Sequence, residues 1–339
     1  MFELLPSERL HRQFNDSELV LVANASAVFD DAAINWLIGN PGTMLAGDRG
    51  QPLAIAVEAD RVSAARAAIE GGGGQFPVAT TGELGERFVR KLRRRSQMLA
   101  FSLDDVTAAK AERLLFASVY KGITDVVTKW AWPIPAFVAT KVAARFGIPP
   151  NAVTVVGILL TVVAGWLFYI GDISGALIAA WMMTFLDTVD GKLARVTVTS
   201  SRLGNILDHG TDIVHPPLWW LALAHGLALL APAASASIWL ACWIILGTHV
   251  LGRAIEQYFR TRFGFNAFLF ARFDSRFRLI VARRNILLLI MTIGLAAGEL
   301  VAAFWACAVW SVISTIIQAA RVAQAARVSR SEALTPWIA

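Results

Sequence analysis

Cysteine is scarce in this chain, with Cys242 and Cys307 as the only two among 339 residues. Both lie in apolar runs, which favours two small core residues and excludes a disulfide framework or a CxxC metal site. The chain also lacks a P-loop signature and a GxGxxG after a strand, so the glycine run from Gly71 is expected to be a surface loop. No basic segment followed by an apolar core opens the sequence, and we therefore expect no cleavable signal peptide.

Acidic residues are the minority among the charges, with 25 Asp and Glu against 31 Lys and Arg. The resulting pI of about 9.7 suits nucleic acid or an anionic membrane face. A hydrophobic content of 56%, a mean hydropathy of +0.56 and 12 tryptophans favour the membrane. Because no nucleic-acid-reading module accompanies the positive charge, we expect a multi-pass integral membrane protein and no nucleic-acid partner.

The composition changes near residue 110, which divides the chain into a soluble part and an apolar part. Residues 1–110 predict a small cytoplasmic α/β domain, and residues 111–150 predict an amphipathic juxtamembrane helix in the membrane interface. Pro133 and Pro135 interrupt this second segment. The expected strands of the α/β domain are 17–29, 43–47 and 53–59, and its expected helices are 30–38 and 60–72.

Residues 151–330 predict an all-α bundle of six transmembrane helices, because their apolar runs approach the length that a bilayer requires. The fifth run is short. The expected spans are 151–170, 173–190, 203–230, 236–255, 284–299 and 301–324.

The loops of this bundle differ in charge and thereby predict its orientation. The connections at 171–174 and 231–237 contain no Lys or Arg, whereas Arg253–Arg284 contains many. The positive-inside rule places the basic loops, both termini and the α/β domain in the cytoplasm, at the inner membrane if the source is bacterial. A basic cluster ahead of the bundle is expected to contact anionic lipid headgroups, with a solvated helix face as the alternative. Its members are Arg87, Arg90, Lys91, Arg93, Arg94 and Arg95.

Four aspartates lie between two apolar segments, where unpaired carboxylates are costly. On a helical wheel Asp187 and Asp190 lie about 60° apart, and Gly204, Asp208 and Asp212 lie within about 80°. Four carboxylates so close cannot all ionise without cations, and oxygen-only ligands favour Mg²⁺ or Mn²⁺. Ion pairs that tie two helices together are the alternative, but the acids outnumber the nearby bases.

Small residues accompany the carboxylates on both predicted helices. Gly191, Ala194 and Gly204 leave room for a bulky, phosphate-bearing group, and Arg195 suits a phosphate. The whole spacing resembles the motif of the CDP-alcohol phosphatidyltransferase family, and Pro150-Asn151-x2-Thr154 resembles a second element of that family. The motif reads Asp187-x2-Asp190-Gly191-x2-Ala194-Arg195-x8-Gly204-x3-Asp208-x3-Asp212.

The resemblance extends over about residues 114–326 and implies a reaction in phospholipid synthesis. A CDP-linked alcohol would donate its substituted phosphate to an acceptor hydroxyl and release CMP, and family members are homodimers. The implied metal ligands are Asp187, Asp190, Asp208 and Asp212, with Asp208 and Asp212 as catalytic residues and Asp212 as the general base. The implied CDP-binding residues are Asn151, Thr154, Asp187, Gly191, Ala194, Arg195 and Gly204.

Two groups of residues are candidates for contact with the acceptor. His209 and His215 flank Asp212 in a stretch that resembles choline and ethanolamine phosphotransferases, although either histidine could instead bond a backbone carbonyl. Four arginines of the basic loop could hold an acceptor phosphate, with headgroup contact and topology as the alternative. These arginines are Arg272, Arg276, Arg283 and Arg284.

The identities of donor and acceptor stay open at this point. CDP-diacylglycerol with a polar alcohol is the first possibility, and a soluble CDP-inositol or CDP-aminoalcohol with a lipid hydroxyl is the second. A membrane transporter or scaffold with a carboxylate ion site is the alternative from another class.

The first domain resembles the nucleotidyltransferase part of bifunctional enzymes that make CDP-inositol and then a phosphoinositol lipid. However, ANAS replaces the usual metal-binding aspartate, no Gly-rich nucleotide loop opens the chain, and the domain is about half the expected size. We therefore expect a non-catalytic relic with a structural or partner-binding role, with an active cytidylyltransferase as the alternative.

Overall fold

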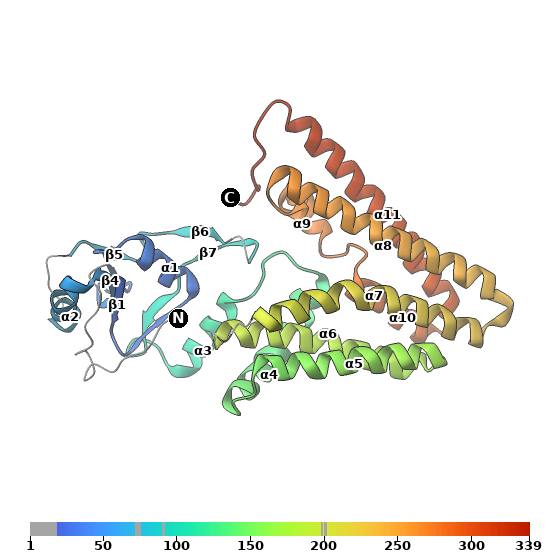
Figure 1. The fold of residues 1–339 in the computed structure, drawn as a ribbon, viewed down its shortest axis with the longest axis horizontal. Coiled ribbons are helices and arrows are strands. Elements are labelled where there is room, and N and C mark those ends of the chain that lie inside the picture. Colours follow the sequence, from blue (N-terminus) through green and yellow to red (C-terminus); the bar gives the residue numbers. More distant parts are fainter. Residues whose placement is uncertain (1–18, 72–75, 90–91, 198, 200–201) are drawn as a thin grey trace. The chain divides into compact units, whose positions relative to one another are not determined.

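A computed structural model describes residues 19–71, 76–89, 92–197, 199 and 202–339, with the backbone alone for Asp31, Arg87 and residues 202–213. The chain forms two compact units (Figure 1). The first comprises the chain up to Val89 together with Arg95–Ser118. The second comprises Arg90–Arg94 and Val119–Ala339.

The first unit is built on a four-stranded sheet with the order β1-β4-β3-β5. β1 (Leu19–Ala23) and β3 (Met44–Ala46) both pair antiparallel with β4 (Pro52–Glu58), while β5 (Val78–Thr80) pairs parallel with β3. β4 buries five consecutive residues, Leu53–Val57, as expected for a central strand that is apolar on both faces.

Two helices cover opposite faces of this sheet because successive side chains of a strand point to opposite sides. Ala56 packs with residues of α1 (Asp31–Gly39), whereas Ile55 and Val57 pack with residues of α2 (Val62–Gly71). The predicted small α/β region is thereby confirmed, with strands and helices close to their expected places.

Two smaller antiparallel pairs complete this part of the chain. β2 (Ala27–Phe29) pairs with β8 (Ala100–Ser102), and β6 (Glu86–Val89) pairs with β7 (Arg94–Gln97). The described members of the basic cluster lie on this β-hairpin, so the helix considered for them is wrong, while Arg90 and Lys91 lie outside the described residues. α3 (Ala108–Ser118) follows these strands.

The segment between the units is not one continuous helix. After α3 comes a π-helical turn, Val127–Ala131, followed by α4 (Pro133–Arg145). Pro133 divides them because proline cannot donate the helical hydrogen bond but fits the first turn of a new helix. Ile134 on α4 is 79% exposed, and Phe146, the C-terminal cap of that helix, is 73% exposed. These apolar positions are compatible with a membrane interface, and the interfacial placement itself stays a prediction.

Six long helices occupy the described part of the second unit, close to the six expected spans. Four of them (α5, α6, α8 with its preceding turn, and α11) are long and apolar enough to cross a membrane, whereas α10 and the apolar part of α7 are shorter. The protein is therefore membrane-embedded, and the count of six spans stays a prediction. The helices are α5 (Pro150–Ile170), α6 (Ile173–Val196), α7 (Arg202–Leu230), α8 (Ser235–Phe263), α10 (Arg284–Ala297) and α11 (Leu300–Val328).

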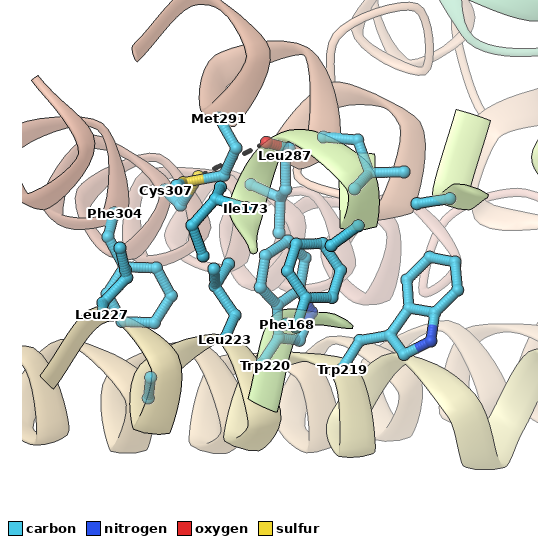
Figure 2. Packing of buried hydrophobic residues seen from close by; sticks show 14 of the residues in the cluster. Phe168, Ile173, Trp219, Trp220, Leu223, Leu227, Leu287, Met291, Phe304 and Cys307 are labelled. Atoms are coloured by element: carbon cyan, nitrogen blue, oxygen red, sulfur yellow. Dashed lines mark hydrogen bonds between the residues drawn. The ribbon is translucent and has the colours of Figure 1, made fainter. Parts of the chain in front are cut away.

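A continuous core joins these helices (Figure 2). α5 packs against α6 and α7, and α11 packs against α8 and α10. Phe168, Trp220 and Phe304 fill the space between them, and Cys307 Sγ donates a hydrogen bond to Leu287 O at 3.5 Å. Lipid tails are as apolar as these side chains, so close packing rather than exclusion from water holds the helices together. Cys242 and Cys307 are both buried and unbridged, as the sequence predicts.

Short turns at the helix ends fix the alignment of α5 with α6. Pro150 begins α5, and Gly171 ends it with a φ of 84°, a left-handed conformation that suits glycine. The Asp172 side chain then accepts the Gly175 N–H at 3.0 Å and caps α6. The two helices therefore run antiparallel, and the start of α5 lies beside the end of α6.

The loop before α10 is held by a buried ion pair. It contains a 3₁₀ turn (Ala267–Leu269) and α9 (Arg272–Phe277). Arg321 of α11 donates to both carboxylate oxygens of Asp274, each at 2.6 Å, and the Asp274 side chain is only 5% exposed.

Replacing Arg321 with leucine should lower the free energy of unfolding by about 3–5 kcal/mol, because it leaves Asp274 buried without its cation. The thermal unfolding midpoint in detergent measures this effect. Adding Asp274→Leu should recover part of the loss, since the unpaired charge is then removed. Arg327→Leu, at an exposed position of the same helix, is the matched control, and equal shifts for Arg321→Leu and Arg327→Leu would contradict the expectation.

Candidate active site

The first half of the carboxylate motif lies on the last turns of α6. Asp190 is buried, and its Oδ2 accepts a hydrogen bond from the Thr154 hydroxyl at 2.6 Å. Thr154 is on the first turns of α5, as is the half-buried Asn151. The two sequence elements that resemble the family therefore meet in space.

Asp187 takes part in a second set of contacts. Its Oδ2 accepts a hydrogen bond from Arg284 Nη2 at 2.7 Å, and Arg284 Nη1 lies 3.2 Å from His215 Nε2. His215 is buried and contacts the edge of Trp219, with ring centroids 4.8 Å apart. The sequence predicted that His215 either contacts the acceptor or bonds a backbone carbonyl. Neither interpretation anticipates its contact with the guanidinium of Arg284.

Gly191 and Arg195 share one face of α6. A Cβ built at Gly191 would lie 3.4 Å from Arg195 Nη2, so the guanidinium occupies part of the space that the glycine leaves. Ala194, which precedes Arg195 in the sequence, is half-buried. Gly191 thus makes room for the guanidinium of Arg195.

The second half of the motif lies on the first turns of α7. The side chains of Gly204, Asp208, His209 and Asp212 fall outside the residues whose side chains are described. Among the described residues, no group of three or more His, Cys, Asp or Glu could hold a metal ion. The roles assigned to these four residues stay predictions.

The described half of the motif fits a hard divalent cation in its chemistry. Asp187 and Asp190 offer carboxylate oxygens from successive turns of one helix face, the donors that Mg²⁺ and Mn²⁺ prefer. Asp187 is also held beside a cation, Arg284, which indicates that this position favours positive charge next to the carboxylate.

A cavity of about 240 Å³ opens beside Asp187 and is lined mainly by α6, α8, α10, α11 and the segment before α4. Its described lining holds seven basic side chains against three acidic ones, an excess of four positive charges. The acidic members are Asp125, Asp187 and Glu256. The basic members are Lys121, Lys192, Arg195, Arg253, Arg278, Arg283 and Arg284.

Arg278 is a buried cation of this lining, with 9% of its surface exposed. Its Nε and Nη1 atoms have no hydrogen-bond partner among the described residues. Burial, and then the charge of Arg283, lowers the pKa of Arg278 to about 9, so the guanidinium remains charged at neutral pH. Buried charges are costly unless paired, so this side chain indicates a place for an anion.

Uncharged and acidic groups also line the cavity. Asp125 accepts hydrogen bonds from the Thr128 N–H at 3.0 Å and from Asn285 Nδ2 at 3.0 Å. Burial would raise the pKa of Asp125, but these hydrogen bonds and the charge of Arg278 bring it below its ordinary value. Burial, and then Asp125, raises the pKa of Tyr120 to about 12. The cavity thus combines a fixed carboxylate with several hydroxyl and amide groups.

Of the four arginines predicted for the acceptor, two line the cavity and two do not. Arg283 and Arg284 contribute to its lining, whereas the exposed Arg276 does not, and Arg272 stacks on Trp337 at 5.4 Å. Sequence reasoning missed Arg278. It lies two residues after Arg276. Arg276 is exposed on α9, whereas Arg278 is buried at the C-terminal cap of that helix, a difference that the sequence does not show.

Lys192 was missed although it lies inside the motif. It is buried on α6 and its ammonium lies 3.9 Å from the centroid of the Tyr120 ring. Its position next to Gly191 was a usable signal, because an apolar helix rarely buries lysine without a partner. Asp125, an isolated acid in an amphipathic segment, offered no comparable signal.

The bundle therefore defines a membrane protein in which a carboxylate motif borders a cation-rich cavity. A sequence profile of the family described as CDP-alcohol phosphatidyltransferase matches residues 148–310. This part of the chain belongs to the CDP-alcohol phosphatidyltransferase family. The first unit lies outside the matched residues.

Three curated proteins are similar to shorter stretches of the chain. Archaetidylinositol phosphate synthase of Pyrococcus horikoshii is 39% identical over 74 residues, 21% of this chain and 38% of that protein. Cholinephosphotransferase 1 of Danio rerio is 33% identical over 25% of this chain and 23% of that protein. Phosphatidylinositol phosphate synthase of Mycobacterium marinum is 30% identical over 26% of this chain and 41% of that protein. The chain thus spans less than half of the length of these relatives.

A solved structure also resembles part of the chain. The crystal structure of phosphatidylinositol phosphate synthase from Mycobacterium tuberculosis with CDP-DAG bound has a TM-score of 0.42 and 21% identity, over 54% of this chain and 91% of that one.

Proposed function

We propose that this protein transfers a substituted phosphate group from a CDP-alcohol to an acceptor hydroxyl and releases CMP, in phospholipid synthesis. The observation that carries the proposal is the contact between Thr154 and Asp190, next to a cavity that holds Arg278. Family membership of residues 148–310 supports the donor, and the cavity supports an anionic acceptor.

The proposed reaction uses groups on both sides of the site. Asp212 takes the proton of the acceptor hydroxyl, whose oxygen attacks the phosphorus that carries the donor alcohol. The pyrophosphate bond breaks and CMP leaves. Asp187 and Asp190, with Asp208 and Asp212, would hold Mg²⁺ or Mn²⁺, which when bound neutralises charge on the pyrophosphate. Arg195, which lines the cavity near these carboxylates, would bind a phosphate oxygen.

The acceptor is proposed to be a phosphorylated polyol. Four excess positive charges suit a phosphate, and hydroxyl and amide groups such as Thr128 and Asn285 suit a polyol. Two of the similar proteins are named as inositol phosphate lipid synthases, which agrees with such an acceptor. CDP-diacylglycerol is then the donor, because a soluble acceptor requires the lipid to arrive on the nucleotide.

Arg278→Met tests the acceptor assignment. We expect kcat/KM for a phosphorylated polyol to fall about 100-fold, equivalent to about 2.7 kcal/mol, because the anion loses a buried cation. The KM for the CDP-alcohol should stay unchanged. Arg276→Met removes the same charge two residues away at an exposed position and is the matched control. A changed donor KM with an unchanged acceptor KM would contradict the assignment.

Two alternative functions can be distinguished from this one by experiment. Similarity to a cholinephosphotransferase favours a soluble CDP-alcohol with a lipid hydroxyl, and intramembrane carboxylates favour a transporter or scaffold. Purified protein with Mg²⁺ should release CMP from CDP-diacylglycerol with glycerol 3-phosphate or inositol phosphate. Release only from CDP-choline or CDP-inositol with diacylglycerol would support the first alternative. No CMP release with any pair would support the second.

The topology and assembly belong to the same proposal. The basic loops, the site and both termini are proposed to face the cytoplasm, and a homodimer is proposed by family resemblance. The division of the chain into residues 1–110, 111–150 and 151–330 is likewise proposed. In the first unit Asn24 Oδ1 accepts the Ser26 N–H at 3.0 Å, so the ANAS turn is an Asx turn. We propose a structural or partner-binding role for this unit.

A further inference from the structure

A short segment that precedes the bundle in sequence packs on the wall of the cavity. Leu92–Arg94 belongs to the same compact unit as the cavity. The Gly122 N–H donates to Leu92 O at 2.8 Å, and a Cβ built at Gly122 would lie only 2.6 Å from Arg94 Cβ. Tyr120, two residues before, lines the cavity. The segment therefore lies directly behind one wall, at a distance that only glycine allows.

Arg93 occupies a strained position in this segment. Its φ of 50° is the only positive value among the described non-glycine residues. Such conformations persist when the surroundings impose them, and they cluster at functional sites. Its carbonyl oxygen would lie 3.1 Å from a Cβ at Gly122, so the tight packing there holds its backbone.

The side chain of Arg93 lies near the charged groups of the cavity, although Arg93 is not among the residues that line it. It is partly buried, and its electrostatic neighbours include Arg283 and Glu256, which line the cavity and pair with each other. Burial, and then the charge of Arg283, lowers the pKa of Arg93, while Glu256 raises it. The charge of Arg93 also contributes to the lowered pKa of Arg278. A further cation held among cations is stabilised by an anion bound between them.

We infer that Leu92–Arg94 supports the wall that Tyr120 and Lys121 form in the acceptor site, and that Arg93 determines specificity by favouring an acceptor that bears a phosphate. This inference rests on the proposed function and extends it to a segment outside the residues that match the family. Arg93 would attract the phosphate together with Arg278 and Arg283, whose charges act on it.

Two variants test the inference by independent routes. Arg93→Asn removes the cation and keeps a residue that accepts positive φ. Gly122→Ala leaves every charged side chain in place and forces Leu92–Arg94 away from the wall. Arg95→Asn removes a cation from an exposed position of the same hairpin and is the matched control.

Acceptor saturation kinetics with CDP-diacylglycerol provide the first measurement. Arg93→Asn and Gly122→Ala should each raise the KM for inositol phosphate about tenfold, the size of one charge-assisted hydrogen bond. The kcat, the KM for the donor and the behaviour of Arg95→Asn should not change. An acceptor KM within twofold of wild type in Arg93→Asn would overturn the inference while leaving the proposed function intact.

Ligand-dependent thermal stability provides a measurement that does not need turnover. Inositol phosphate and inorganic phosphate should raise the unfolding midpoint of the wild type, and this shift should shrink in Arg93→Asn and Gly122→Ala. If no donor and acceptor pair releases CMP but this pattern holds, the proposed function fails and the anion site at Arg93 stands. Equal shifts in wild type and both variants would overturn the inference.

Discussion

Replacing Asp190 with asparagine is expected to reduce CMP release about 1,000-fold or more. The change removes the charge of a proposed metal ligand. A bound metal ion would stabilise the charge of the transition state by several kcal/mol, and each 1.36 kcal/mol of barrier changes the rate tenfold. Asparagine still offers Oδ1 to the Thr154 hydroxyl, so the contact between α5 and α6 survives. CMP release at saturating substrate and Mg²⁺, together with the unfolding midpoint, separates loss of chemistry from loss of fold.

Asp172→Asn is the matched control for this variant. Asp172 caps the other end of the same helix, and asparagine caps helices as well as aspartate does. We expect its CMP release to stay close to wild type. If Asp190→Asn released CMP at a comparable rate, the assignment of α6 as half of the catalytic site would be wrong.

Asp212→Asn is expected to lower kcat about 10²–10⁴-fold, the usual contribution of a general base. Nucleotide binding should persist, because three of the four carboxylates remain. Titration of the purified variant with CDP-diacylglycerol measures binding, and single-turnover CMP release measures the chemical step. Wild-type kcat in this variant would remove Asp212 from the role of base, whereas lost binding with unchanged chemistry would indicate a purely metal-holding role.

The sequence predicted the helical bundle well because its signal is strong and local. Long apolar runs between charged loops specify helices whatever their neighbours do, so α5, α6, α7, α8, α10 and α11 begin near the expected residues. The ends of α6 and α8 lie beyond the expected spans, at Val196 and Phe263, and α9 was not predicted. The carboxylate motif was predictable for a related reason. Asp187 and Asp190 share a helix face by spacing alone.

The rest of the site depends on contacts between distant segments. Arg278 and Arg276 are two residues apart in one basic loop, and only the packing of α9 buries the first and exposes the second. His215 contacts Arg284, which is far away in sequence and carries no pattern that links the two. The hairpin of the basic cluster was missed because its charges obscure the alternation that marks a strand.

The hydrogen bond between Thr154 and Asp190 has a mechanical consequence for α5 and α6. The Gly171–Asp172 turn joins these helices at one end, and this bond joins them at the other, so α5 and α6 are tied together at both ends. Trp219 Nε1 of α7 also donates to Thr161 O of α5 at 2.9 Å, so the part of α7 after Pro217 is packed onto the same pair. Pro216 and Pro217 interrupt the hydrogen-bond ladder of α7 and give that helix a natural point of bending. The second half of the carboxylate motif lies on α7 before these prolines, so bending there would move it relative to Asp187 and Asp190.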